Sequence, residues 1–153
     1  ILGAKIGCPD TPVIGFAGDG AFGISMNEMS SCAREEWPAI SMVIFRNYQW
    51  GAEKRNTTLW FDDNFVGTEL DPELSYAKVA DACGLKGVTV RTMEETTAAI
   101  KQSCEDQKNG ITTFIEVILN QELGEPFRRD AMKRPVKVAG INKEDMIKQP
   151  SLI

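Results

Sequence analysis

The fold is decided by residues 13–51, which read VIGFAGDGAF at 13–22 and ISMVIFRNYQWG at 40–51, with a helical pattern between them. Each apolar run has the length of a strand and ends in a polar, glycine-bearing turn, the first at Asp19 and the second at Asn47. A spacing of about 28 residues suits one strand–helix–strand unit, whose two parallel strands lie side by side. The carboxyl ends of such strands meet at the edge of an open α/β sheet where ligands bind. We therefore expect the carboxylate of Asp19 and the carboxamide of Asn47 to converge.

The groups expected at that edge suit a magnesium-bound diphosphate. Asp19 and Asn47 offer hard oxygen ligands without sulfur or imidazole, which favours Mg²⁺ or Ca²⁺ over zinc. Gly18 and Gly20 flank Asp19, so the backbone there can approach a ligand closely. The helical segment that follows presents its amino-terminal end, which favours an anion.

The triplet Gly18-Asp19-Gly20, followed about thirty residues later by Asn47 at the close of an apolar strand, resembles the thiamin-diphosphate motif of the pyruvate decarboxylase and acetolactate synthase superfamily. Residues 1–119 are similar to the diphosphate-binding domain of that superfamily. The resemblance implies an α/β fold, an open parallel β-sheet with helices on both faces, truncated at its N-terminus.

The same resemblance implies which residues would hold thiamin diphosphate and Mg²⁺. The expected cofactor contacts come from Gly18, Asp19, Gly20, Ala21, Phe22, Asn47, Gln49, Trp50 and Gly51. The metal ligands would be Asp19, Asn47 and the backbone carbonyl of Gln49, with two diphosphate oxygens and a water completing an octahedron. The family motif commonly ends in two asparagines, so the contribution of Arg46, at the first of these positions, stays open.

Two further stretches, NYQWGAEKRN at 47–56 and PFRRDAMK at 126–133, resemble the branch of this superfamily whose members are acyltransferases that act on sulfoacetaldehyde. This resemblance implies that sulfoacetaldehyde and phosphate are converted into acetyl phosphate and sulfite. Guanidinium and ammonium groups would recognise the anionic substrates. The side chains expected there are Arg46, Lys54, Arg55, Arg128 and Arg129. A packing role stays the alternative for each arginine.

The superfamily places the carboxylate that activates the cofactor on another cofactor-binding domain, so the resemblance implies no catalytic residue within these 153 residues. It also implies that the cofactor lies between domains of two subunits, in a homodimer or homotetramer, and that the chain alone is inactive. Two alternatives stay open. One is another thiamin-diphosphate enzyme, either an acetolactate-synthase-like carboligase or a 2-oxo acid decarboxylase. The other is a non-catalytic phosphate-binding α/β module.

The composition argues against several classes of function. There are 17 basic and 22 acidic residues, and the net charge of −5 argues against nucleic acid as the partner. No apolar run is long enough to span a membrane. The four cysteines have no C-x-x-C spacing and the chain has no histidine, which disfavours zinc sites and Ser-His or Cys-His catalysis. Free thiols are typical of a reducing cytoplasm, where we expect the protein to act.

The remaining segments predict further helices and strands. Ser25–Glu28 and Thr92–Glu95 have the pattern of capping boxes, each of which would begin a helix. Asp71 is expected to cap another helix, with Pro72 at its first position. Strands are expected at residues 39–45, 88–90 and 111–119.

The two ends of the chain differ from this alternating pattern. Residues 1–7 look like the end of a helix without its beginning, so we expect a fragment of a longer polypeptide with 1–119 as its cofactor-binding domain. From residue 120 the alternation stops, and residues 120–153 are basic and contain prolines. We expect this segment to be a tail packed on a neighbouring domain or subunit.

Overall fold

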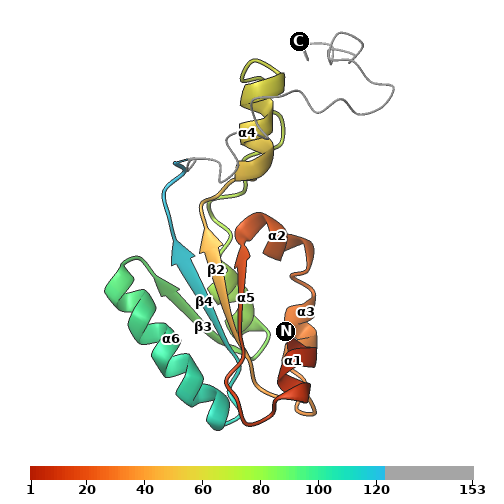
Figure 1. Cartoon of the computed structure of the whole chain (residues 1–153), viewed down its shortest axis with the longest axis vertical. Coiled ribbons are helices and arrows are strands. Elements are labelled where there is room, and N and C mark those ends of the chain that lie inside the picture. The colour runs from red at the N-terminus through yellow and green to blue at the C-terminus, as the bar shows by residue number, and fades with distance from the viewer. Residues whose placement is uncertain (123–153) are drawn as a thin grey trace.

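The computed structural model describes residues 1–122 and shows one open sheet of four strands (Figure 1). The strands are β1 (Ile14–Gly18), β2 (Ser41–Arg46), β3 (Lys86–Val90) and β4 (Thr113–Ile118). They lie in the order β1-β2-β4-β3, and every neighbouring pair is parallel. The predicted open parallel sheet is confirmed.

Helices cover both faces of this sheet, as the alternation of strands and helices predicts. One face carries α2 (Asp19–Ile24), α3 (Glu28–Cys32) and α5 (Tyr76–Ala82). The other face carries α6 (Met93–Lys108), which crosses β2, β3 and β4. The short helix α1 (Leu2–Gly7) lies beside α3 (Figure 1).

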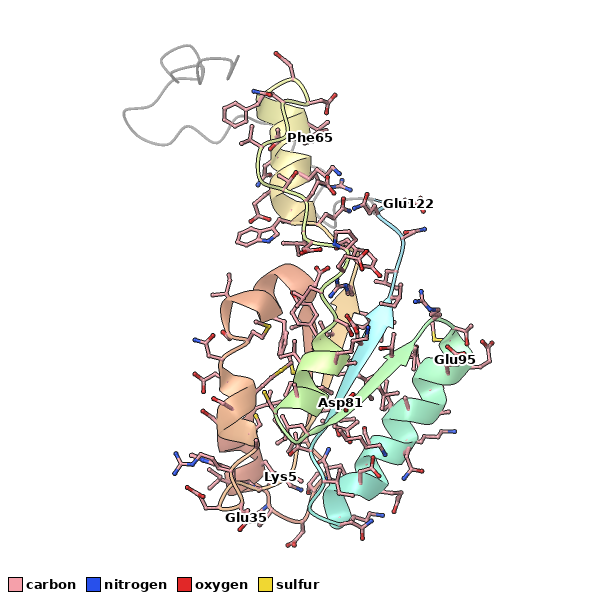
Figure 2. The ribbon with its side chains drawn as sticks, turned by 180° about the vertical axis from the view of Figure 1, so that it is seen from behind. Lys5, Glu35, Phe65, Asp81, Glu95 and Glu122 are labelled. Atoms are coloured by element: carbon pink, nitrogen blue, oxygen red, sulfur yellow. The ribbon has the colours of Figure 1, made fainter. Side chains whose placement is uncertain are left out.

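Helix α4 (Gly51–Trp60) stands apart from these layers. It extends beyond the carboxyl ends of the strands and, with the loop after it, forms an arm (Figure 1). Figure 2 shows Phe65 on this arm, with Lys5 and Glu35 at the opposite end of the molecule. The base of the arm is tied down by an antiparallel bridge between Gln49 and Glu69. The turn that contains Asn47 thus leads directly from β2 into the arm.

Two apolar cores hold the layers together. On the α5 face, the rings of Phe22 and Tyr76 meet edge-to-face at 5.2 Å between centroids, and Phe114 packs beside them. On the α6 face, the core centres on Val43 and Ile115, both fully buried. Apolar side chains on both faces of β2 and β4 explain why these strands read as nearly continuous hydrophobic runs.

The strand register brings the two halves of the predicted motif to one edge. Gly18 at the end of β1 pairs with Phe45, one residue before the end of β2. Asp19 follows β1 at once, and Asn47 follows β2 at once. The expected convergence of Asp19 and Asn47 therefore follows from the register rather than from the length of the intervening segment.

The predicted helix starts have different outcomes. The capping box at Thr92–Glu95 is confirmed, with reciprocal hydrogen bonds between the two residues. The predicted capping box at Ser25–Glu28 is wrong, because α2 begins at Asp19 and Ser25 is its carboxyl-terminal cap. The cap at Asp71 is also wrong. Its carboxylate accepts from the amide of Glu73 in a turn, and α5 begins at Tyr76 after the cap Ser75.

Within residues 1–122, no helix has the length and apolar character needed to cross a membrane. The tail predicted at 120–153 lies outside the described residues except for its first three positions.

Candidate cofactor site

The site is built around the carboxylate of Asp19, the first residue of α2. This side chain is only 3% exposed. Its Oδ2 accepts a hydrogen bond from the amide of Tyr48 at 2.7 Å, and its Oδ1 accepts one from the amide of Gly20 at 2.9 Å. No ion pair with a described residue neutralises it. A buried carboxylate in this state is expected to need a cation.

The turn after β2 supplies the second part of the site. Tyr48 has φ = 61°, in the left-handed region that non-glycine residues rarely adopt. Such a conformation costs about 1–3 kcal/mol and is concentrated at functional sites. Here it accompanies the hydrogen bond from the Tyr48 amide to Asp19. The half-buried carboxamide of Asn47 makes no hydrogen bond to any residue in 1–122, so it stays available to a ligand.

The side chain of Gln49 is already engaged. It is 2% exposed, its Nε2 donates to the carbonyl of Gln121 at 2.8 Å, and its Oε1 accepts from Lys54 at 3.2 Å. By contrast, no backbone amide among the described residues donates to the Gln49 carbonyl. Of the oxygens of Gln49, the backbone carbonyl is therefore the one free to bind a metal, as the family resemblance implies.

These three groups fit a hard divalent cation. A buried carboxylate, a free carboxamide and a free backbone carbonyl are the oxygen ligands that Mg²⁺ accepts alongside phosphate oxygens and water. Residues 1–122 contain no cluster of three or more His, Cys, Asp or Glu side chains that could hold a metal instead. The residues present thus fit a magnesium-bound diphosphate, with Asp19, Asn47 and Gln49 as its protein ligands.

The other predicted cofactor contacts surround this centre in different ways. A Cβ on Gly20 would lie 3.3 Å from Cδ1 of Trp50, so the indole covers that glycine closely. The side chain of Phe22 lies in the core, only 8% exposed, so its backbone alone could reach a cofactor. Gly18, Ala21 and Gly51 are at least partly exposed, and Cβ space at Gly18 is open.

Tyr76 and Thr68 belong to this region although the sequence did not indicate them. The hydroxyl of Tyr76 donates to the backbone carbonyl of Asp19 at 3.1 Å. Burial raises the pKa of this phenol, and the nearby charge of Asp19 adds to the effect, so it stays a donor. Thr68 is 5% exposed, and its backbone carbonyl accepts a hydrogen bond from the amide of Trp50 at 2.7 Å. The side-chain hydroxyl of Thr68 has no partner in the described residues.

The predicted anion-binding residues that lie within residues 1–122, namely Arg46, Lys54 and Arg55, differ in their environments. Arg46 is 2% exposed and forms an ion pair with the equally buried Glu116 at 3.0 Å, which corrects its expected role because it cannot meet a substrate. Lys54 pairs with Glu69. Arg55 is half-buried and has no ion pair with a described residue. Arg128 and Arg129 lie outside the described residues.

Comparison with known proteins decides the family. Residues 1–117 match the family described as "Thiamine pyrophosphate enzyme, C-terminal TPP binding domain". The chain belongs to this family. The expected resemblance to thiamin-diphosphate enzymes is thereby confirmed, and thiamine pyrophosphate is the cofactor for which the family is named.

Several relatives that the chain resembles are named as sulfoacetaldehyde acetyltransferases. The chain is 77% identical over 146 residues to a "Probable sulfoacetaldehyde acetyltransferase" of Rhizobium meliloti, covering 95% of this chain and 25% of that protein. It is 69% identical over 149 residues to a "Sulfoacetaldehyde acetyltransferase" of Roseovarius nubinhibens, covering 97% of this chain and 25% of the relative. The chain thus spans about a quarter of the length of these curated relatives.

The fold agrees with solved structures of two decarboxylases. A thiamine diphosphate-dependent 4-hydroxybenzoylformate decarboxylase from Rhodococcus jostii superposes with a TM-score of 0.70 at 27% identity, covering 80% of this chain and 22% of that one. A benzoylformate decarboxylase from Polynucleobacter necessarius superposes with a TM-score of 0.67 at 25% identity, over 82% of this chain and 23% of that one.

Proposed function

We propose that this chain is the diphosphate- and Mg²⁺-binding part of a thiamin-diphosphate acyltransferase that converts sulfoacetaldehyde and phosphate into acetyl phosphate and sulfite. The observation that carries the proposal is the 77% and 69% identity, over nearly the whole chain, to relatives named for this transfer. The site supports it, because the carboxylate of Asp19, which has no ion pair with a described residue, the carboxamide of Asn47 and the Gln49 carbonyl are oxygens of the kind that Mg²⁺ prefers.

When bound, thiamin diphosphate supplies the nucleophilic carbon that attacks the aldehyde. The residues of this chain bind and orient. Asp19 would hold the metal with a carboxylate fixed by the amides of Gly20 and Tyr48. The indole of Trp50 would keep water away from the backbone at Gly20. The activating carboxylate would come from the other cofactor-binding domain of the same enzyme, in a homodimer or homotetramer in the cytoplasm.

Recognition of the anionic substrates falls to fewer residues than the sequence suggested. Arg55, which has no ion pair with a described residue, is the strongest candidate, and Lys54 would contribute once released from Glu69. Arg128 and Arg129 remain proposed anion ligands. Replacing each of these four residues by alanine should raise the KM for phosphate, and the same change at the exposed Arg34 is the control.

Sulfite release by the full-length protein tests the proposed function. The mixture contains sulfoacetaldehyde, Mg²⁺ and thiamin diphosphate, with or without phosphate. We expect phosphate-dependent sulfite that Asp19→Ala abolishes and that Asp10→Ala, at an exposed carboxylate, leaves unchanged. Sulfite that persists in Asp19→Ala would show that Asp19 is not the metal anchor.

A second candidate function is supported by the solved structures. Two decarboxylases of this family superpose on the chain with TM-scores of 0.70 and 0.67. An enzyme that binds thiamin diphosphate with Mg²⁺ but releases no sulfite would be such a decarboxylase or a carboligase. Calorimetry with the cofactor, with and without Mg²⁺, separates both from a non-catalytic phosphate-binding module.

A further inference from the structure

We propose that Arg46 is a positioning residue for the magnesium site, holding the Asn47–Tyr48 turn through a buried ion pair with Glu116. The inference rests on the proposed function in one respect, namely that this turn holds the metal. Arg46 would bind neither substrate nor cofactor. Its guanidinium would fix the two tyrosines that hold Asp19 in place.

The ion pair is buried and densely hydrogen-bonded. Arg46 Nη1 donates to Glu116 Oε1 at 3.0 Å, and Nη2 donates to the carbonyl of Asp71 at 2.9 Å. Both side chains of the pair are 2% exposed. Glu116 also accepts from the hydroxyl of Ser75 at 2.7 Å and from the amide of Tyr76 at 3.2 Å. The charge of Arg46 is therefore neutralised inside the protein.

The guanidinium lies over two aromatic rings. Its Cζ is 4.5 Å from the ring centroid of Tyr48 and 5.2 Å from that of Tyr76. Guanidinium groups stack well on aromatic faces, and the contact is stronger away from water. Arg46 therefore restrains Tyr48 and Tyr76 at once.

Both tyrosines hold the same residue. The amide of Tyr48 donates to the carboxylate of Asp19 at 2.7 Å, and the hydroxyl of Tyr76 donates to the Asp19 carbonyl at 3.1 Å. Tyr48 does so from φ = 61°, a conformation that persists only when its surroundings enforce it. The guanidinium over the Tyr48 ring would contribute to that enforcement.

An ion pair between Lys86 of β3, whose side chain is 39% exposed, and the buried Asp106 of α6 offers a control. Lys86 Nζ donates to Asp106 at 2.6 Å, and Asp106 is 5% exposed. Lys86 begins β3, so this pair lies at the amino-terminal edge of the sheet, opposite the proposed metal site. Asp106→Asn should lower stability without touching the Asn47–Tyr48 turn. It separates a loss of stability from a loss of positioning.

The test compares Arg46→Met and Arg46→Lys with Asp106→Asn in the full-length protein. The first readout is hydrogen exchange of the Tyr48 amide without cofactor. The second is the Mg²⁺ concentration that half-saturates thiamin diphosphate binding. For Arg46→Met we expect the exchange rate of the Tyr48 amide and the half-saturating Mg²⁺ concentration each to rise by about tenfold, corresponding to about 1.4 kcal/mol. Arg46→Lys keeps the charge but loses the planar stack, so its values should fall between wild type and Arg46→Met.

The outcomes separate this inference from the proposed function. The positioning role would be overturned if the exchange rate of the Tyr48 amide in Arg46→Met equals that of the wild type. It would also be overturned if Asp106→Asn changes the exchange rate and the Mg²⁺ dependence as much as Arg46→Met does. If Arg46→Met does not fold, Arg46→Lys with wild-type exchange and Mg²⁺ dependence would overturn it equally. A wild-type protein that binds no cofactor would remove the proposed function, while the exchange comparison would still decide whether Arg46 holds the turn.

Discussion

Gly87 provides the sharpest test of how α5 positions the site. A Cβ at Gly87 in β3 would lie 2.0 Å from the carbonyl oxygen of Ala77 and 2.6 Å from its carbonyl carbon. Both are backbone atoms of α5, so no flexible side chain can give way. Since carbon–oxygen contacts are normally at least about 3.3 Å, Gly87→Ala must move α5 and β3 apart by roughly 1 Å.

The expected cost follows from what α5 holds. Overpacking of this kind costs about 1–3 kcal/mol. The shift also lengthens the bonds from the amides of Tyr76 and Ala77 to Glu116, which are already 3.2 and 3.4 Å. Losing a hydrogen bond to a charged group costs about 1.5–3 kcal/mol. We expect a total of about 4 kcal/mol, together with weaker thiamin diphosphate binding, because Tyr76 would release Asp19.

Calorimetry and cofactor titration of the full-length protein measure both effects. Gly87→Ala should lower the melting temperature of this domain by about 10 °C or more. Gly3→Ala in α1 is the matched control, because its Cβ would meet nothing within 4 Å. It should leave stability unchanged or raise it by up to about 1 kcal/mol. A Gly87→Ala protein within about 2 °C of wild type would refute the argument, since the shift of α5 would then carry no cost.

Three further predictions follow from single features. Thr68→Val should stabilise the cofactor-free protein by about 1 kcal/mol, because it removes a buried hydroxyl without a partner in the described residues. Burial opposes ionisation of Asp106, but hydrogen bonds led by that from Lys86 outweigh it and lower the pKa of the carboxyl. The stabilisation by the ionised carboxyl of Asp106 is thus present above the unfolded pKa of about 3.9 and is lost as pH falls through the lower folded pKa. The urea concentration at the midpoint of unfolding should therefore fall less steeply with decreasing pH in Asp106→Asn than in the wild type. Removing Mg²⁺ with EDTA should abolish thiamin diphosphate binding in calorimetry, because the diphosphate would face Asp19 without a cation.

Each of these has a contrary result. Thr68→Ser keeps the hydroxyl and is the control. A Thr68→Val protein that is less stable would mean that the hydroxyl does find a partner. An acid profile of Asp106→Asn parallel to wild type would remove Asp106 from the acid transition. Cofactor binding that survives EDTA would contradict the metal site.

The sheet and the central part of the site could be predicted because they depend on local patterns. The apolar runs ending at Asp19 and Asn47 specify parallel strands, and parallel strands bring their ends together. The capping box at Thr92 could also be predicted, because both of its partners lie within one turn at the start of α6. At Ser25 the same pattern failed, because α2 had already occupied the preceding residues.

The buried network behind the site could not be predicted in the same way. Arg46 and Glu116 are 70 positions apart, and their pairing depends on β4 lying beside β2. One signal was available, because Glu116 lies between apolar residues in a strand that is buried over its first five positions. A carboxylate in that position requires a partner. The partner's identity, and the role of Tyr76, came only with the strand order.

The register of β1 and β2 has a consequence for how such proteins diverge. Asp19 and Tyr48 meet because Gly18 pairs with Phe45, and neither α3 nor the turn before β2 takes part in that contact. Insertions and deletions in the loops on either side of α3 should therefore be tolerated in evolution, as long as the two strands keep their pairing and Met29 of α3, 1% exposed, stays in the core. Homologues with quite different spacing between the two halves of the motif would then carry the same chemistry, and searches that fix this spacing would overlook them.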